Sequence, residues 1–172
     1  MFLVSGVLAA LIAAKTTGKG DVVDAAMDDG TALLGGLFQA LGAQGLWSAQ
    51  RGGNLLDGGA PFYRCYACQD GAYVAVAALE PRFYASLITG LDLKDFANAQ
   101  YDPSTWPQQH SVFAETFQTR DRDDWIEHFS GSEACVTPVL TFDEARLHPH
   151  AAARMIYSGV SPNPAPRFGG LA

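Results

Sequence analysis

The sequence is most constrained around Asp57, which is followed directly by two glycines, an alanine and a proline (57–61, DGGAP). Glycine has no Cβ, so the backbone at Gly58 and Gly59 can approach a bound group closely and turn its amides towards an oxygen. A carboxylate beside such amides suits the removal of a proton next to a carbonyl, with the amides holding the oxyanion. Aspartate followed by glycine is also one of the commonest turn dipeptides. Two interpretations therefore stand side by side, a reactive loop and an ordinary turn.

Patterns on both sides of this loop predict a chain of mixed helices and strands. Apolar positions recur at helical spacing after Met1, and Lys15 with Gly18 marks the expected end of that helix. Two runs of residues that favour strands lie on either side of residues 69–71 and predict a hairpin. We expect helices over 2–15, 30–47, 81–89, 108–118 and 122–130, strands over 21–27, 62–68, 73–79 and 134–140, and a short last helix after Thr141.

Three of these segments carry further expectations. The helix over 30–47 is apolar nearly all round, so we expect it to be deeply packed or to lie at a subunit contact. The stretch over 92–107 is polar and irregular, which predicts a linker. The tail from Ser161 is rich in proline and glycine and is predicted to be a connecting segment.

Four blocks of the sequence resemble α-methylacyl-CoA racemases, which belong to the family III CoA-transferase superfamily. The blocks are TGKGDVVDAAMDDGTALL (17–34), LLDGGAPFYRCY (55–66), DGAYVAVAALEPRFYASLITGL (70–91) and ACVTPVLTFDEA (134–145). The resemblance implies an α/β fold in which residues 1–92 are the C-terminal part of a Rossmann-like large domain. Residues 93–172 would be a linker and part of a smaller α/β domain. It also implies an internal fragment lacking both ends, because the family helix that matches the start of this chain lies inside a domain.

The chemistry that the resemblance implies is racemisation at the carbon α to a CoA thioester. One base removes the α-proton, an enolate forms, and a second base returns a proton to the other face. Asp57 matches the family's aspartate base, and Gly58, Gly59 and Ala60 would bind the substrate. The family's histidine base lies upstream of the position that matches Met1, so the 172-residue chain is expected to be inactive alone.

Two other functions stay open on the same residues. A family III CoA transferase would use Asp57 as a nucleophile and form an acyl anhydride. A non-catalytic remnant would only associate with other chains, and the missing histidine favours that alternative.

Glu144 is the second catalytic residue that the resemblance implies, as the partner of the family's histidine, with Asp143 as the less favoured substitute. Thr141 and Glu144 also form the T-x-x-E pattern of a helix capping box, in which the Glu144 carboxylate bonds the Thr141 amide. Both interpretations stay open. His148 and His150 follow closely and are interpreted as helix-end histidines.

The cysteines predict no metal site. Cys65 and Cys68 form a C-x-x-C, but a zinc site needs further ligands and the sequence holds no second pair. Positions 65 and 68 of a strand also face opposite sides. With Cys135 the count of cysteines is three. An odd count in a sequence of the non-secreted type favours reduced thiols and a cytoplasmic protein.

Composition and charge restrict the partners. The net charge is −7 and the basic residues are scattered, which argues against a nucleic-acid partner. The apolar run over 2–14 is too short to span a bilayer, which needs about 20 residues. The resemblance implies acyl-CoA as substrate, no separate cofactor, and a homodimer whose chains interlock through their linkers. We therefore expect the chain to dimerise or aggregate through exposed apolar surface rather than to be a monomer.

Overall fold

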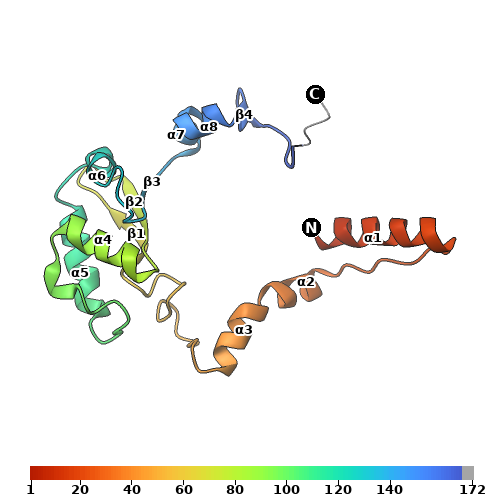
Figure 1. Ribbon diagram of the computed structural model, residues 1–172, viewed down its shortest axis with the longest axis horizontal. Helices are drawn as coiled ribbons and strands as arrows, with labels where there is room; N and C mark the ends of the chain where they lie inside the picture. Colours follow the sequence, from red (N-terminus) through yellow and green to blue (C-terminus); the bar gives the residue numbers. More distant parts are fainter. Residues whose placement is uncertain (168–172) are drawn as a thin grey trace. The chain divides into compact units, whose positions relative to one another are not determined.

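The computed structural model describes residues 1–167, which belong to two compact units divided between Gln50 and Arg51. Figure 1 shows the chain coloured from red at the N-terminus to blue at the C-terminus. Among residues 1–167, no helix combines the length and the apolar character that a membrane span requires.

The first unit is helical. Helix α1 (Phe2–Thr17) ends where Gly18 turns into the left-handed region with φ 72° and donates its amide to the Ala14 carbonyl. This is a glycine C-cap, so the predicted helix and its stop are confirmed. Helices α2 (Met27–Leu34) and α3 (Gly36–Ala43) follow. The prediction of one continuous helix over 30–47 is wrong, because the chain breaks at Gly35, where two adjacent glycines make helix least favourable.

The strand predicted over 21–27 is also wrong. Residues 19–26 form neither helix nor strand, and Met27 already begins α2. Ala26 has an extended backbone, with φ −66° and ψ 145°, but neither sheet of the described residues includes this segment. A strand needs a neighbour to bond its N–H and C=O groups. The valine-rich composition therefore does not form a strand here.

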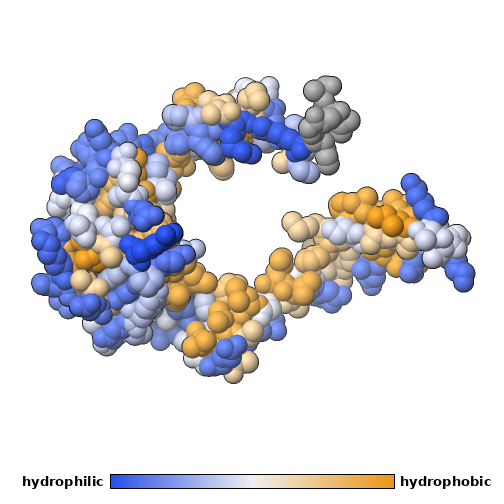
Figure 2. Space-filling model, in the orientation of Figure 1, coloured by the Kyte–Doolittle hydropathy of each residue, from blue (hydrophilic) through white to orange (hydrophobic). Residues whose placement is uncertain are grey.

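The helices of the first unit are exposed. None of α1, α2 and α3 contains a buried residue, so the prediction of deep packing over 30–47 is wrong. Figure 2 shows apolar residues along these helices. The apolar side chains that are more than half exposed include Leu3, Val4, Leu8, Leu11 and Ile12 on α1, Leu33 and Leu34 on α2, and Leu37 on α3. The other alternative, a subunit contact, stays a prediction.

The second unit contains a three-stranded antiparallel sheet in the order β1-β2-β3. Strands β1 (Tyr63–Ala67) and β2 (Tyr73–Ala77) form the predicted hairpin, and β3 (Val136–Val139) pairs with β2. Pro138 lies opposite Val74 in this pairing. Proline has no amide hydrogen, and it is tolerated here because β3 is an edge strand.

The helices between β2 and β3 lie beside this sheet (Figure 1). They are α4 (Pro81–Leu91), the single 3-10 turn η1 (Lys94–Phe96), α5 (Trp106–Phe117) and α6 (Arg122–His128). The three predicted helices are confirmed, with ends that shift by no more than two residues. Gly90 lies inside α4, and Asp92 caps it with φ 54°. Asp121 is the N-cap residue of α6, although its side chain makes no capping hydrogen bond.

The remaining elements of this unit are short. Helices α7 (Phe142–Leu147) and α8 (Pro149–Ala153) precede the two-stranded pairing of β4 (Tyr157–Ser158) with β5 (Ser161–Pro162). The predicted connecting tail thus begins as a strand. Its last part, 168–172, lies outside the described residues.

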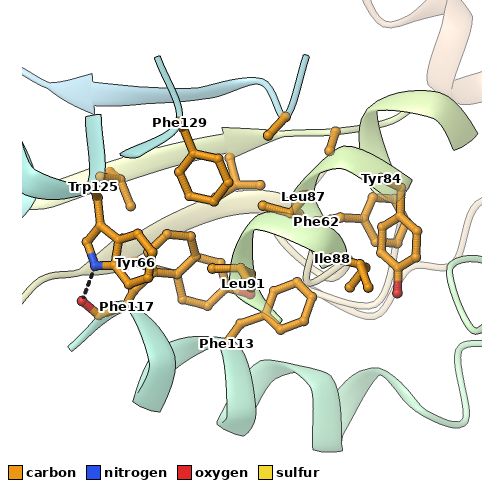
Figure 3. Packing of buried hydrophobic residues seen from close by; sticks show 14 of the residues in the cluster. Phe62, Tyr66, Tyr84, Leu87, Ile88, Leu91, Phe113, Phe117, Trp125 and Phe129 are labelled. Carbon is orange, nitrogen blue, oxygen red and sulfur yellow. Dashed lines mark hydrogen bonds between the residues drawn. The ribbon is translucent and has the colours of Figure 1, made fainter. Parts of the chain in front are cut away.

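An aromatic core joins the sheet to α4, α5 and α6 (Figure 3). Phe117 of α5 stacks on Tyr66 of β1 with ring centroids 5.1 Å apart, and its carbonyl accepts a 2.8 Å hydrogen bond from the Trp125 indole. The predicted linker over 92–107 is largely irregular, but its Phe96 and Trp106 pack against this core. The domain boundary predicted at residue 92 stays a prediction.

Candidate active site

Asp57 lies in the loop over 51–62, which leads into β1. The C-terminal side of this loop is anchored in the core, where Pro61 and Phe62 are fully buried. The buried Tyr66 hydroxyl donates a 2.6 Å hydrogen bond to the Pro61 carbonyl. The loop is therefore held at the end that enters the sheet, while Asp57 itself is exposed.

The loop wraps around the Asp57 carboxylate. Its Oδ1 accepts hydrogen bonds from the amides of Asn54 (2.9 Å) and Gly59 (3.1 Å). Its Oδ2 accepts from the Asn54 side-chain amide (2.7 Å) and the Gly52 amide (3.1 Å). Desolvation alone would raise the pKa of Asp57, but these hydrogen bonds outweigh it and hold the pKa below its ordinary value. The turn interpretation is thus confirmed, and the turn presents an ionised carboxylate to solvent.

The glycines after Asp57 differ in what they do. A Cβ on Gly59 would lie 2.6 Å from the Asn54 carbonyl oxygen and 2.7 Å from that of Gly52, so no side chain fits there. The close approach expected of this glycine is made by the loop's own backbone. The Gly59 amide already donates to Asp57. Gly58 adopts φ 86° with open space where a Cβ would stand. An oxyanion-binding role stays a prediction for both, as does substrate binding by the fully buried Ala60.

His110 of α5 reaches this loop from 51 residues further along the chain. Its Nε2 lies 2.7 Å from the Gly59 carbonyl oxygen, and its Nδ1 lies 2.7 Å from Nη1 of Arg64 on β1. A carbonyl only accepts and a guanidinium only donates, so the imidazole is neutral and carries its proton on Nε2. Desolvation lowers the pKa of His110; the Gly59 contact opposes this and the Arg64 charge adds to it. No local pattern could have indicated a contact across 51 residues.

Glu144 makes the capping box that its spacing predicts. Its carboxylate accepts a 2.7 Å hydrogen bond from the Thr141 amide, and its own amide donates to the Thr141 hydroxyl at 3.2 Å. Arg122 of α6 adds an ion pair of 2.8 Å. The Arg122 hydrogen bond first, and the Thr141 bonds next, lower the pKa of Glu144 to about 2. Its contacts are thus with α7 and α6, whereas those of Asp57 are within its own loop. The catalytic role stays a prediction.

The neighbours of Glu144 have structural contacts. Asp143 pairs with Arg146 one turn along α7. His148 is the N-cap residue of α8, and its Nδ1 accepts a 3.2 Å hydrogen bond from the His150 amide. The interpretation of these histidines as helix-end residues is confirmed.

The cysteines are free thiols. Cys65 is exposed on β1 and Cys68 is buried just beyond it, as their opposite facing in a strand predicts. Burial is the main reason that the pKa of Cys68 and that of Cys135 are raised. Over residues 1–167, no cluster of three or more histidine, cysteine, aspartate or glutamate side chains could hold a metal ion.

Comparison with known families decides the classification. The sequence model of CoA-transferase family III matches residues 1–166. The chain belongs to CoA-transferase family III. It is 44% identical over 167 residues to α-methylacyl-CoA racemase of Homo sapiens and 42% identical to that of Mus musculus. Both alignments cover 94% of this chain and 44% of the relative. The chain therefore spans less than half the length of these two relatives.

One further relative agrees with this placement, and two solved structures show the fold. A CaiB/baiF CoA-transferase family protein of Caenorhabditis elegans is 32% identical over 168 residues, which cover 94% of this chain and 48% of that protein. Two crystal structures of Rv3272 from Mycobacterium tuberculosis superpose with TM-scores of 0.72 and 0.69 at 14% and 16% identity. Each match covers 97% of this chain, and 45% or 46% of the Rv3272 chain. The predicted α/β fold of CoA-transferase family III is thereby confirmed.

Proposed function

We propose that the Asp57 loop is the proton-transfer site of an α-methylacyl-CoA racemase, which inverts the α-carbon of 2-methylacyl-CoA thioesters through an enolate. The observation that carries the proposal is the Asp57 carboxylate, which is exposed to an incoming substrate and is held ionised by four hydrogen bonds. The 44% identity to a racemase supports the choice of reaction.

The geometry suggests how this carboxylate acts as a base. Its hydrogen bonds restrict it to one orientation, so a proton on a bound α-carbon would meet a positioned acceptor. A low pKa makes it a weak base while the site is open to water. Desolvation already acts to raise this pKa, and an acyl chain that excludes water would strengthen that effect. Binding of the substrate would thus make Asp57 more basic.

Inversion needs a second acid–base group on the other face of the α-carbon. We assign it to a histidine in the part of the relatives that this chain does not cover, with Glu144 as the partner of that histidine. In this structure His110 is not available as a base, because Nε2 donates to Gly59 and Nδ1 accepts from Arg64. We therefore propose that the 172-residue chain alone is inactive.

The family also contains CoA transferases, in which Asp57 would instead be the nucleophile. One experiment separates these functions, using the protein extended to the length of its relatives and (R)- or (S)-2-methylacyl-CoA in deuterated water. A racemase incorporates deuterium at the α-carbon and converts either enantiomer into a mixture of the R and S forms. A transferase instead forms an acyl adduct on Asp57 that hydroxylamine traps, and it moves CoA between acyl groups. Absence of both signals would leave only a non-catalytic role and would refute the proposal.

We further propose that the protein is a homodimer. We propose that it lies in the cytoplasm, where its free thiols stay reduced. The support is the uncovered apolar surface of α1, α2 and α3, since monomers rarely expose large contiguous apolar patches. Sedimentation equilibrium at tens of micromolar (roughly the range in which weak association shows) should give at least twice the monomer mass. A single species at the monomer mass would contradict the proposed association.

A further inference from the structure

The contacts of His110 extend in two directions from one side chain. On one side, Nε2 meets the Gly59 carbonyl oxygen at 2.7 Å. On the other, Nδ1 meets Nη1 of Arg64 at 2.7 Å. The same Nη1 also lies 3.4 Å from Nε2, but Nε2 donates to Gly59, so only Nδ1 can accept from Arg64. His110 therefore links α5, β1 and the Asp57 loop through one defined tautomer.

Gly59 has little freedom to move independently of the rest of the loop. Its position is in van der Waals contact with the backbone of Asn54 and Gly52, closely enough to exclude any Cβ. The same two residues supply the other hydrogen bonds to the Asp57 carboxylate. A displacement of Gly59 would therefore disturb every donor around Asp57.

Arg64 is itself positioned by the fold. Its guanidinium carbon lies 5.5 Å from the centre of the Tyr66 ring, on the same strand. The Tyr66 hydroxyl in turn holds the Pro61 carbonyl, two residues after Gly59. The two carbonyls that flank Ala60 are thus held from outside the loop, one by α5 and one by β1.

We propose that Arg64 and His110 are positioning residues of the Asp57 site, which clamp the Gly59 peptide and thereby keep the carboxylate in its productive orientation. As positioning residues, neither side chain contacts the reacting atoms. The catalytic meaning of the clamp rests on the function proposed above, but the clamp itself is a property of the free protein and can be measured without substrate.

The test uses the whole chain and three NMR readouts: the ¹⁵N shifts of the His110 ring, the pKa of the Asp57 carboxyl, and hydrogen exchange of the Gly59 amide. In the unaltered protein the ring should be neutral with its proton on Nε2. His110→Leu should speed Gly59 exchange about 2- to 10-fold, as expected for the loss of one hydrogen bond, and should raise the pKa of Asp57. His110→Gln should restore both values, because its side-chain amide can donate to the same carbonyl.

A matched control separates this effect from loss of any histidine. His128 of α6 also contacts a carbonyl through Nε2, that of Gly90 at 2.8 Å. His128→Leu should leave both the Gly59 exchange rate and the Asp57 pKa unchanged. If His110→Leu does not fold, Arg64→Met serves instead, because the exposed Arg64 keeps its aliphatic stem and loses only its donor. That variant should raise the pKa of His110, because the Arg64 charge that lowers it is gone, and should speed Gly59 exchange.

Two results would overturn the proposal. One is a His110 proton on Nδ1 in the unaltered protein. The other is a Gly59 exchange rate that neither His110→Leu nor Arg64→Met changes. Since every readout is made without acyl-CoA, these results leave the proposed racemase function standing. Conversely, absence of racemisation in the extended protein would not affect the clamp.

Discussion

Asp57→Asn is expected to lower the rate of α-proton exchange in the extended protein by a factor of ~10² to 10⁴, since this is what a positioned base contributes. The asparagine has nearly the size of the aspartate but cannot accept the α-proton. Its oxygen can still accept the hydrogen bonds of Asn54 and Gly59 at the position of Oδ1. Its nitrogen would instead face two donors at the position of Oδ2, from Asn54 and Gly52. The substitution therefore removes the base and also loosens one side of the loop.

The measurement is deuterium incorporation into each 2-methylacyl-CoA enantiomer, followed by mass spectrometry. Exchange from the enantiomer whose proton faces Asp57 should be lost, and racemisation should fail with it. Asp70→Asn is the matched control, because Asp70 is another exposed aspartate in a turn. Its carboxylate accepts a 3.0 Å hydrogen bond from the Ala72 amide. Wild-type exchange from both enantiomers in Asp57→Asn would show that another residue is the base.

Phe113→Ala is expected to lower the free energy of unfolding of the second unit by about 3–5 kcal/mol, the usual cost of removing a buried phenylalanine ring. Phe113 of α5 is fully buried, and its ring centroid lies 6.1 Å from that of Tyr66 and 6.4 Å from that of Phe96. The truncation would leave a cavity between the sheet and the segment after α4. Because native domains are stable by only about 5–15 kcal/mol, the variant should be largely unfolded at modest denaturant.

Urea unfolding followed by tryptophan fluorescence measures this loss, since Trp125 lies in the same core. Phe142→Ala is the control: the same residue type is 86% exposed at the start of α7, so its loss should change stability by no more than about 0.5 kcal/mol. Equal losses in the two variants would show that the core assigned to the second unit is not what stabilises it.

The same core explains why His110 meets the Asp57 loop. His110 and Phe113 lie one turn apart on α5, and the burial of Phe113 against the sheet fixes which side of the helix faces β1. Arg64 on β1 and Gly59 just before it are then within reach. The proposed clamp is in this sense a consequence of core packing, although its residues are polar.

Features that depend on residues within about four positions of one another could be predicted from the sequence. The capping box of Thr141 and Glu144, the stop of α1 at Gly18 and the hairpin of β1 and β2 are examples. The turn around Asp57 belongs with them, because Asn54 and Gly59 lie three and two positions from Asp57 in the chain. The local sequence therefore predicts the turn at Asp57, and the family resemblance implies its catalytic role.

Tertiary structure decided what depends on a partner far along the chain. The valine-rich run over 21–27 has the composition of a strand, but a strand exists only where another one bonds to it, and here none does among the described residues. The contact of His110 with Gly59, and that of Arg122 with Glu144, bring together residues 51 and 22 positions apart. No local pattern encodes such contacts, because they arise only when packing of the apolar faces sets the distance between the elements.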